Sequence, residues 1–246
     1  MEHYLKRIGY DGDRTPNAEN LARLIRCHIE HVPFENLDFY RNPRELSLDC
    51  ADLYDKVVTR RRGGVCCELN TLLHKLLTDL GYDARPVLTR ITLMPEPCPI
   101  SHECVITVLD GKRYYCDVGF GGPGPKGLVC MDEPEIQVVY GESYRARWDG
   151  CIGTISKLMD GQWVPMLQLL DIPANVADFA IMLHYFTTHP GSRFVNLRTI
   201  NLCLPGGYLA LTGNTFTGRR GGEAIHREVP EEQIPALLRE EFGLVI

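Results

Sequence analysis

The chain has 246 residues, of which 44% are hydrophobic, and a formal net charge of −6 at pH 7. A chain of this length can bury a substantial core, either as one unit or as two to three small ones. The acidic balance argues against a broad nucleic-acid-binding surface. Neither a signal-peptide pattern nor an apolar run of membrane-span length is present, so we expect a cytoplasmic protein with no membrane partner.

Ten cysteines are scattered along the sequence. In a chain without an export signal this usage favours reduced thiols over a disulfide framework. The sequence contains no C-x-x-C pair and no His/Cys cluster with zinc spacing, so we expect no metal site.

The first third of the sequence is typical of helices. Thr15-Pro16 predicts a helix start, and apolar residues recur at helical spacing from Leu21 until Pro33 stops them. A second helix is predicted within 47–60, capped by Ser47 or Asp49. A third is predicted from Cys66 to Leu80, ended by Gly81.

From about Arg85 the pattern changes to short alternating runs with turn residues between them, which predict strands. The clearest are "RPVLTRITL", "HECVITVL", "KRYYCDVGF", "EIQVVY" and "YRARWDG". Residues 176–190 look helical again, and the tail mixes strand-like pieces ("TINLCL", "GYLALTG") with a closing helix, "PEEQIPALLREEFG". The order of helices, strands and a mixed tail indicates an α+β protein.

The stretch "RRRGGVCCELN" presents two adjacent cysteines at the start of the third helix. Cys66 shares a stripe with the leucines that follow at intervals of three and four, so we expect it to face the protein. Cys67 lies about 100° round the helix, on a mostly polar face that we expect to point toward water. A helix N-terminus stabilises a thiolate, which makes Cys66 a candidate nucleophile; a buried structural thiol is the alternative. Gly63 and Gly64 would allow a tight turn and close approach of a ligand to the backbone.

A partner for that cysteine comes from "SHECVITVLDGKRYYCDVGF". Asp110-Gly111 between two alternating strands predicts a two-residue hairpin turn, in which paired residue numbers sum to about 221. This register makes His102 and Asp117 diagonal neighbours on one face, within hydrogen-bonding reach. A three-residue loop would put them on opposite faces. An ordinary edge-strand histidine and a strand-end aspartate are the alternative.

These motifs together resemble the arylamine N-acetyltransferases, and the resemblance covers essentially the whole chain, including "HVPFENLDF", "THPGSRFVN" and "EEFGLVI". It implies an N-terminal helical bundle (1–84), a central antiparallel β-barrel (85–175) and an interdomain helix with a C-terminal α/β lid (176–246). It also implies a Cys-His-Asp triad, which falls on Cys66, His102 and Asp117. Family members often carry aromatic residues where this sequence has Val65 and Cys67, and a threonine where it has Ser101.

The activity that the resemblance implies is transfer of an acetyl group from acetyl-CoA, through an acetyl-cysteine, to an aromatic amine or hydrazine by ping-pong kinetics. CoA is then a co-substrate, and the candidates to bind it are Gly119, Gly121, Gly122, Thr188, Ser192 and Arg193. The stretches 119–122 and 188–193, which contain these residues, could instead be simple turns. For Arg60, Arg61 and Arg62 we favour a structural role, and we give Phe34, Glu35 and Asn36 only bundle packing and capping.

Three other functions remain open at this point. Related amide synthases keep the triad but take acyl chains from other thioesters; Val65 and a chain that ends soon after "FGL" would suit a roomier channel. A cysteine hydrolase or transglutaminase-like enzyme uses the same triad on amides. A ligand-binding protein without catalysis would need none of the triad's reactivity.

Overall fold

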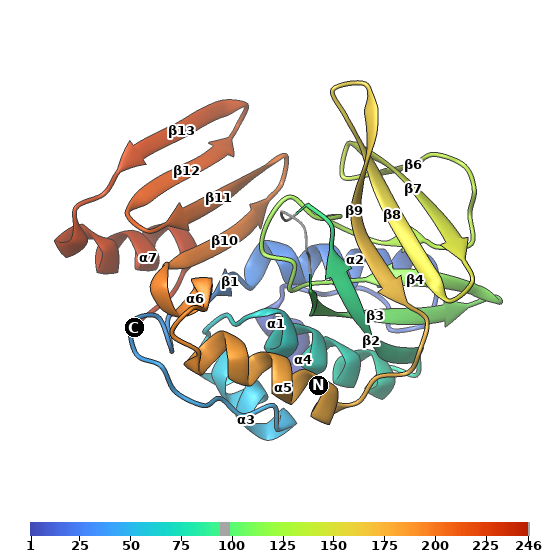
Figure 1. The fold of residues 1–246 in the computed structure, drawn as a ribbon, viewed down its shortest axis with the longest axis horizontal. Coiled ribbons are helices and arrows are strands. Elements are labelled where there is room, and N and C mark those ends of the chain that lie inside the picture. The colour runs from blue at the N-terminus through green and yellow to red at the C-terminus, as the bar shows by residue number, and fades with distance from the viewer. Residues whose placement is uncertain (94–98, 246) are drawn as a thin grey trace.

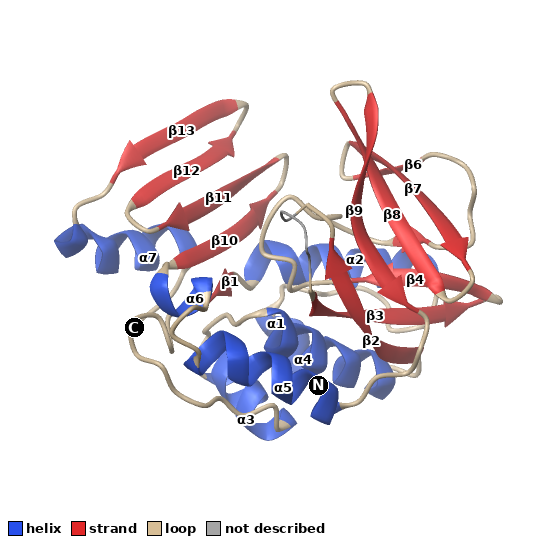
Figure 2. Ribbon diagram, in the orientation of Figure 1, coloured by secondary structure: helices blue, strands red, loops and turns tan. Residues whose placement is uncertain are grey.

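The computed structural model describes residues 1–93 and 99–245. Its α-helices are α1 (Glu2–Arg7), α2 (Ala18–His31), α3 (Cys50–Tyr54), α4 (Cys66–Asp79), α5 (Val176–Thr188), α6 (Arg193–Asn196) and α7 (Ile234–Phe242). Its strands are β1 (Phe34–Glu35), β2 (Asp83–Ile91), β3 (Ile100–Leu109), β4 (Lys112–Cys116), β5 (Val129–Cys130), β6 (Gln137–Val139), β7 (Glu142–Asp149), β8 (Ile152–Met159), β9 (Gln162–Leu170), β10 (Thr199–Leu204), β11 (Gly207–Thr212), β12 (Thr215–Arg220) and β13 (Glu223–Glu228). The predicted α+β class is confirmed, and Figure 2 shows the helices together with two separate sheets.

The predicted helices of the first third are present, with shifted ends. Helix α2 begins at Ala18 rather than at Pro16, because the Asn17 side chain accepts a hydrogen bond from the Asn20 backbone N–H and so caps the helix. Asp49 caps α3, as one of the two predicted residues, and that helix continues through a π-helical turn over Asp55–Thr59. Helix α4 starts at Cys66 as predicted.

Eight antiparallel strands form the central sheet in the order β5-β4-β3-β2-β9-β8-β7-β6. The sheet coils so far that β5 also contacts β6 and β7, which nearly closes a barrel. Strands β8 and β9 were not predicted from the sequence. Strand β9 contains Pro165, which pairs with Ser156 at the point where the register shifts. Proline is normally excluded from the interior of a sheet, and the bulge at this point accommodates it.

The C-terminal lid is a five-stranded sheet in the order β1-β10-β11-β12-β13, with α7 packed on one face (Figure 1). Its edge strand β1 comes from the N-terminal third: Phe34 pairs with Asn201 and Glu35 with Ile200. A two-residue strand carries almost no sequence signal, so this connection was not predicted. We propose the division at 84 and 175, with β1 tying the first unit to the third.

Candidate active site

The hairpin between β3 and β4 has the predicted register. Leu109 pairs with Lys112 and Val105 with Cys116. Asp110 and Gly111 both have positive φ, 50° and 75°, which is the conformation that a type I′ turn requires. The turn therefore sets which residues face each other at the far end of the hairpin.

At that far end His102 and Asp117 are in contact. His102 Nε2 lies 2.6 Å from Asp117 Oδ2, and both side chains are almost fully buried. Asp117 also accepts hydrogen bonds from Asn70 Nδ2 at 2.9 Å, from the Gly119 backbone N–H at 2.7 Å and from the Tyr115 hydroxyl. Burial raises the pKa of the Asp117 carboxyl, but His102 and these donors outweigh it and hold that pKa below its usual value. Asp117 is thus an anion with a fixed orientation.

Cys66 stands at the first position of α4, 5% exposed, with its thiol beside the His102 ring. A hydrogen bond from Cys67 contributes most to lowering the pKa of Cys66 well below its usual value; burial opposes the shift, and His102 reinforces it. Burial likewise disfavours a charged His102, but the Asp117 carboxylate and then Cys66 raise the pKa of the ring to about 10. The geometry therefore favours a thiolate–imidazolium pair oriented by Asp117.

The expectation that Cys67 faces water is wrong. Its side chain is fully buried, as are Glu68 and Thr71 on the neighbouring turns. Helix α4 packs against β2 and β3, so its first two turns are covered on every side. Thr71 on this face is buried and bonds Glu103, whereas Thr78, two turns further on, is exposed as predicted for a polar face.

Asn70, which the sequence analysis did not single out, connects the three segments of the site. Its Nδ2 donates to the Glu103 carbonyl at 2.6 Å and to Asp117, and its Oδ1 accepts from the Val118 backbone N–H at 3.0 Å. The available signal was an amide one helical turn after Cys66, next to the leucines of the apolar stripe. A buried side-chain amide needs hydrogen-bond partners, so this asparagine indicated polar groups on the segments that pack against the helix.

Glu103, directly after the histidine, was also missed. It is fully buried, and Thr71 Oγ1 lies 3.1 Å from both of its carboxyl oxygens. Burial, followed by the neighbouring Cys66 charge, raises the pKa of Glu103 well above its usual value, so this carboxyl is neutral when Cys66 is ionised.

Buried ion pairs support the loop that leads into α4. Arg62 contacts Glu35 at 2.8 Å and Asp38 at 3.0 Å, and Lys56 contacts Glu68 and Asp38, both at 2.8 Å. The structural role predicted for Arg62 is therefore observed, while Glu35 contributes a charge as well as packing.

The glycines of that loop approach the chain's own backbone. A Cβ on Gly63 would lie 2.0 Å from the Pro33 carbonyl oxygen, so no other residue fits there. Gly119 is similar, since its Cβ would lie 2.6 Å from Cys66 Cα. Gly119 thus packs against Cys66 and Gly63 against Pro33, so the close approach at Gly63 is made by the chain itself and not by a ligand.

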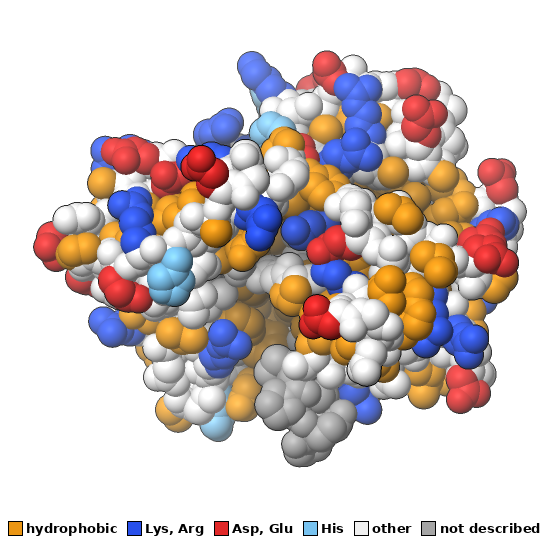
Figure 3. Space-filling model, turned by 90° about the horizontal axis from the view of Figure 1, so that it is seen from above, with side chains coloured by type: hydrophobic (Ala, Val, Ile, Leu, Met, Phe, Trp, Pro, Cys, Tyr) orange, Lys and Arg blue, Asp and Glu red, His pale blue; other side chains and the backbone are white. Residues whose placement is uncertain are grey.

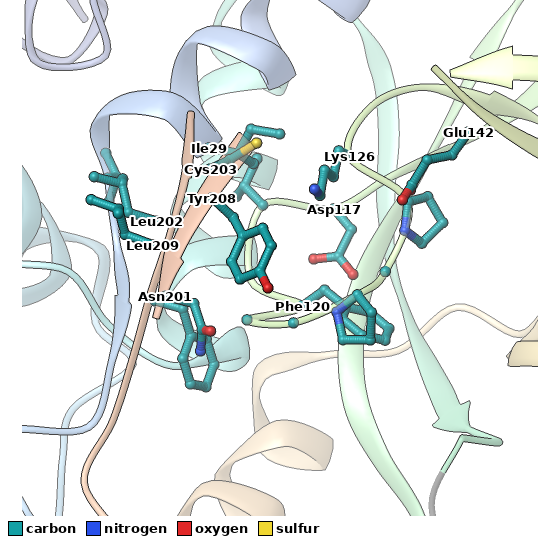
Figure 4. Close-up of a pocket in the computed structure, with 18 of the residues that line it drawn as sticks. Ile29, Asp117, Phe120, Lys126, Glu142, Asn201, Leu202, Cys203, Tyr208 and Leu209 are labelled. Atoms are coloured by element: carbon teal, nitrogen blue, oxygen red, sulfur yellow. The ribbon is translucent and has the colours of Figure 1, made fainter. Parts of the chain in front are cut away.

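A cavity of about 380 Å³ lies beside the site, between the barrel, α2 and the lid. Phe120, Gly121 and Gly122 form one wall and Tyr208 of β11 the opposite wall, with Lys126 and Glu142 at the rim (Figure 4). The surface is hollowed where the lid and the barrel face each other, and basic side chains gather next to the hollow (Figure 3). Val65 is fully buried and does not line this cavity, so its small size adds no room there.

The structure separates the six residues predicted to bind CoA. Gly121 and Gly122 line the cavity, whereas Gly119 packs on Cys66. Thr188 and Ser192 donate their hydroxyls to the carbonyls of His184 and Phe186, at 2.6 and 2.7 Å, and Arg193 is exposed at the start of α6. These three residues lie outside the cavity wall, at the junction of α5 and α6.

Within residues 1–93 and 99–245, no group of three or more His, Cys, Asp or Glu side chains is placed to hold a metal ion. Among the helices of the same residues, none is long and apolar enough to cross a membrane. The nine cysteines that the structure describes carry free thiols; Cys98 lies outside the described residues.

The comparisons with known proteins agree with this geometry. A family model described as "N-acetyltransferase" matches residues 17–246. The arylamine N-acetyltransferase of Mycolicibacterium smegmatis is 32% identical over 230 residues, which cover 91% of this chain and 83% of the relative. That of Escherichia coli K12 is 30% identical over 250 residues, covering 99% and 88%.

Solved structures show the same likeness. Arylamine N-acetyltransferase from Salmonella typhimurium is 30% identical with a TM-score of 0.90, covering 99% of this chain and 90% of that one. The Mycobacterium marinum enzyme, solved in complex with CoA, is 27% identical with a TM-score of 0.89, covering 99% and 92%. From its sequence, its fold and these relatives, this chain belongs to the arylamine N-acetyltransferase family.

Proposed function

We propose that this protein is an acetyl-CoA-dependent arylamine and arylhydrazine N-acetyltransferase that works through an acetyl-Cys66 intermediate. The observation that carries the proposal is the alignment of Cys66, His102 and Asp117, with Nε2 of the histidine 2.6 Å from the aspartate. That alignment leaves Nδ1 of the ring for Cys66. Family membership supports the reaction class.

In the first half-reaction, His102 has taken the proton of Cys66, and the thiolate attacks the thioester carbonyl of the donor. The C–S bond to CoA breaks, and the departing CoA sulfur takes the proton from His102. Asp117 keeps the ring oriented and stabilises its charge throughout. The backbone N–H of Cys66 stands in the first turn of α4, where no intrahelical partner exists, and is our candidate donor to the oxyanion.

In the second half-reaction, the acceptor amine attacks the acetyl carbon. Neutral His102 takes a proton from the amine, the C–S bond to Cys66 breaks, and the amide leaves. Aromatic amines and hydrazines suit this step, because their weakly basic nitrogen is unprotonated at neutral pH. The two half-reactions share one nucleophile, which gives ping-pong kinetics.

The cavity beside Asp117 is our candidate for the CoA-binding region. Gly121 and Gly122 bring backbone close to its interior, and Lys126 supplies a positive charge beside Tyr208 that suits a phosphate. We keep Gly119, Thr188, Ser192 and Arg193 as proposed contributors at its margins. A CoA thioester and a small amine are the proposed partners, without nucleic acid or membrane, and the cytoplasm is the proposed location.

The test is the intact mass of the protein after brief incubation with acetyl-CoA, followed by peptide mapping. One acetyl group on Cys66, discharged by an arylamine or a hydrazine and absent from Cys66→Ser, is the expected result. Absence of an adduct, while Cys66 still reacts rapidly with an alkylating agent, would overturn acetyl-CoA as the donor. Longer acyl thioesters would then be tested, as the amide synthase alternative requires.

A further inference from the structure

Next to the proposed nucleophile lies a second thiol that the mechanism does not use. Cys67 Sγ is 3.9 Å from Cys66 Sγ, and the Cys67 side chain is fully buried. A buried S–H can hydrogen-bond only within the protein, and this distance is within the range for two sulfur atoms. The two sulfurs are thus in contact at the start of α4.

We propose that Cys67 is a positioning residue that donates its S–H to the Cys66 thiolate, so that the nucleophile is stabilised by Cys67 on one side and by His102 on the other. The proposal rests on the proposed function, in which Cys66 is the nucleophile. It adds a residue that touches neither substrate nor cofactor.

The surroundings determine which of the two sulfurs ionises. Cys66 faces the cationic ring of His102 from β3, whereas Cys67 faces two carboxyl side chains, Glu68 of its own helix and Glu103 of β3. Lys56, the nearby cation, is bound to Glu68. The hydrogen bond to Cys66 first, and then burial and the negative charge of the Cys66 thiolate, raise the pKa of Cys67 well above its usual value. Cys67 therefore keeps its proton and is the donor.

The pair is unsuited to a disulfide. Consecutive Cα atoms are about 3.8 Å apart across a trans peptide, which is shorter than the separation that an unstrained disulfide spans. The helical conformation of both residues adds to this constraint. Cys67 thus remains available as a hydrogen-bond donor.

This arrangement has a consequence for both half-reactions. A thiolate accepts the Cys67 hydrogen bond strongly and a thioester sulfur accepts it weakly, so the bond favours free Cys66 over the acetylated form. It stabilises Cys66 as the leaving group when the amine attacks. Loss of the donor should therefore slow transfer to the acceptor as well as raise the pH at which Cys66 ionises.

The test is the pH profile of Cys66 alkylation by iodoacetamide, read by fragment mass spectrometry, which needs no acyl donor. In Cys67→Ala the pH of half-maximal rate should rise by about one unit, the effect of losing one hydrogen bond to a charged group. Cys67→Ser keeps a donor and should stay closer to the wild type. Cys130→Ala, which removes another buried thiol in β5, is the matched control and should leave the profile unchanged.

Two outcomes would overturn the proposal. Either Cys67→Ala shows the wild-type profile, or Cys67→Ser shifts as far as Cys67→Ala, which would mean that packing rather than donation matters. Thermal unfolding of each variant establishes that it is folded, and Cys67→Val provides a second variant without a donor if alanine destabilises the site. A profile that shifts as expected in a protein that acetyl-CoA does not acetylate would overturn the proposed function and leave this inference standing.

Discussion

Near the start of β3, His102 depends on neighbouring groups for its charge. Burial alone would lower the pKa of the ring, and the Asp117 carboxylate reverses that effect and raises it to about 10. Asp117 in turn stays ionised because four donors, including His102, surround it. Reactivity at Cys66 is therefore a property of the group and not of any single residue.

Asp117→Asn should lower kcat for acetyl transfer on the order of 10⁴-fold, as removal of the orienting carboxylate does in other triads. Without the anion, burial lowers the pKa of His102 and the imidazolium is lost at neutral pH. Steady-state kinetics checks this. Asp132→Asn removes a carboxylate that pairs with Arg113 in the barrel, and its kcat should match the wild type. Equal kcat for both variants would contradict the role given to Asp117.

Glu103→Gln should stabilise the protein increasingly as pH rises. The folded-state pKa of Glu103 is raised, so an unfolded chain loses this proton from about pH 4.5 while the folded protein keeps it. Wild-type stability is therefore lost as pH rises toward the folded-state value, and glutamine removes that loss while still bonding Thr71. Thermal unfolding from pH 4.5 to 8 should show a gap between the variant and the wild type that widens with pH. The exposed Glu223→Gln should show a constant difference.

At the scale of elements, turn residues and capping residues predicted structure correctly where a few neighbouring residues determine the backbone conformation. The Asp110-Gly111 turn fixed the hairpin register, because only residues that tolerate positive φ form this turn. The starts of α2, α3 and α4 were predicted to within three residues. Strand β9 was missed because Pro165 interrupts its pattern and a bulge accommodates that proline.

Gly111→Ala should destabilise the protein by about 1 kcal/mol, because alanine at φ 75° is strained. The cost is purely conformational, since a Cβ at this position would meet no atom within 4 Å. Urea unfolding measures it, and acetyl transfer should be retained because the remaining ladder holds the register. Gly191 is exposed and does not have a positive φ, so Gly191→Ala should reduce the free energy of unfolding by less than Gly111→Ala.

At the scale of the whole molecule, one buried side chain links the N-terminal third to the lid. Asn36 Nδ2 donates to the carbonyls of Phe194 and Leu197, at 2.5 and 2.8 Å, and its Oδ1 accepts from the Thr199 N–H at 2.8 Å. Together with the pairing of β1 and β10, this contact holds the lid sheet against the bundle. From the sequence Asn36 was predicted to contribute only packing and capping, because its partners lie some 160 residues away in the chain.

Asn36→Ala should reduce the free energy of unfolding by about 2–4 kcal/mol, because it removes all three hydrogen bonds that this buried amide makes to the Phe194 and Leu197 carbonyls and the Thr199 N–H. Urea unfolding should show the loss, and limited proteolysis should cut the lid faster. Asn196→Ala removes hydrogen bonds at an exposed position and should cost less than 1 kcal/mol. Similar losses for the two variants would contradict the linking role of Asn36.

The sequence by itself determined the order of helical, strand-rich and mixed segments, the hairpin register, the candidate nucleophile and the two residues aligned with it, because caps, turn residues and periodicity act over a few residues. Only the tertiary structure decided that Cys67 is buried, that Glu103 and Asn70 belong to the site, and that Thr188, Ser192 and Arg193 lie apart from the cavity wall. These features depend on which elements pack together, and burial sets their hydrogen bonds and charges. Periodicity along one helix cannot show what covers its polar face.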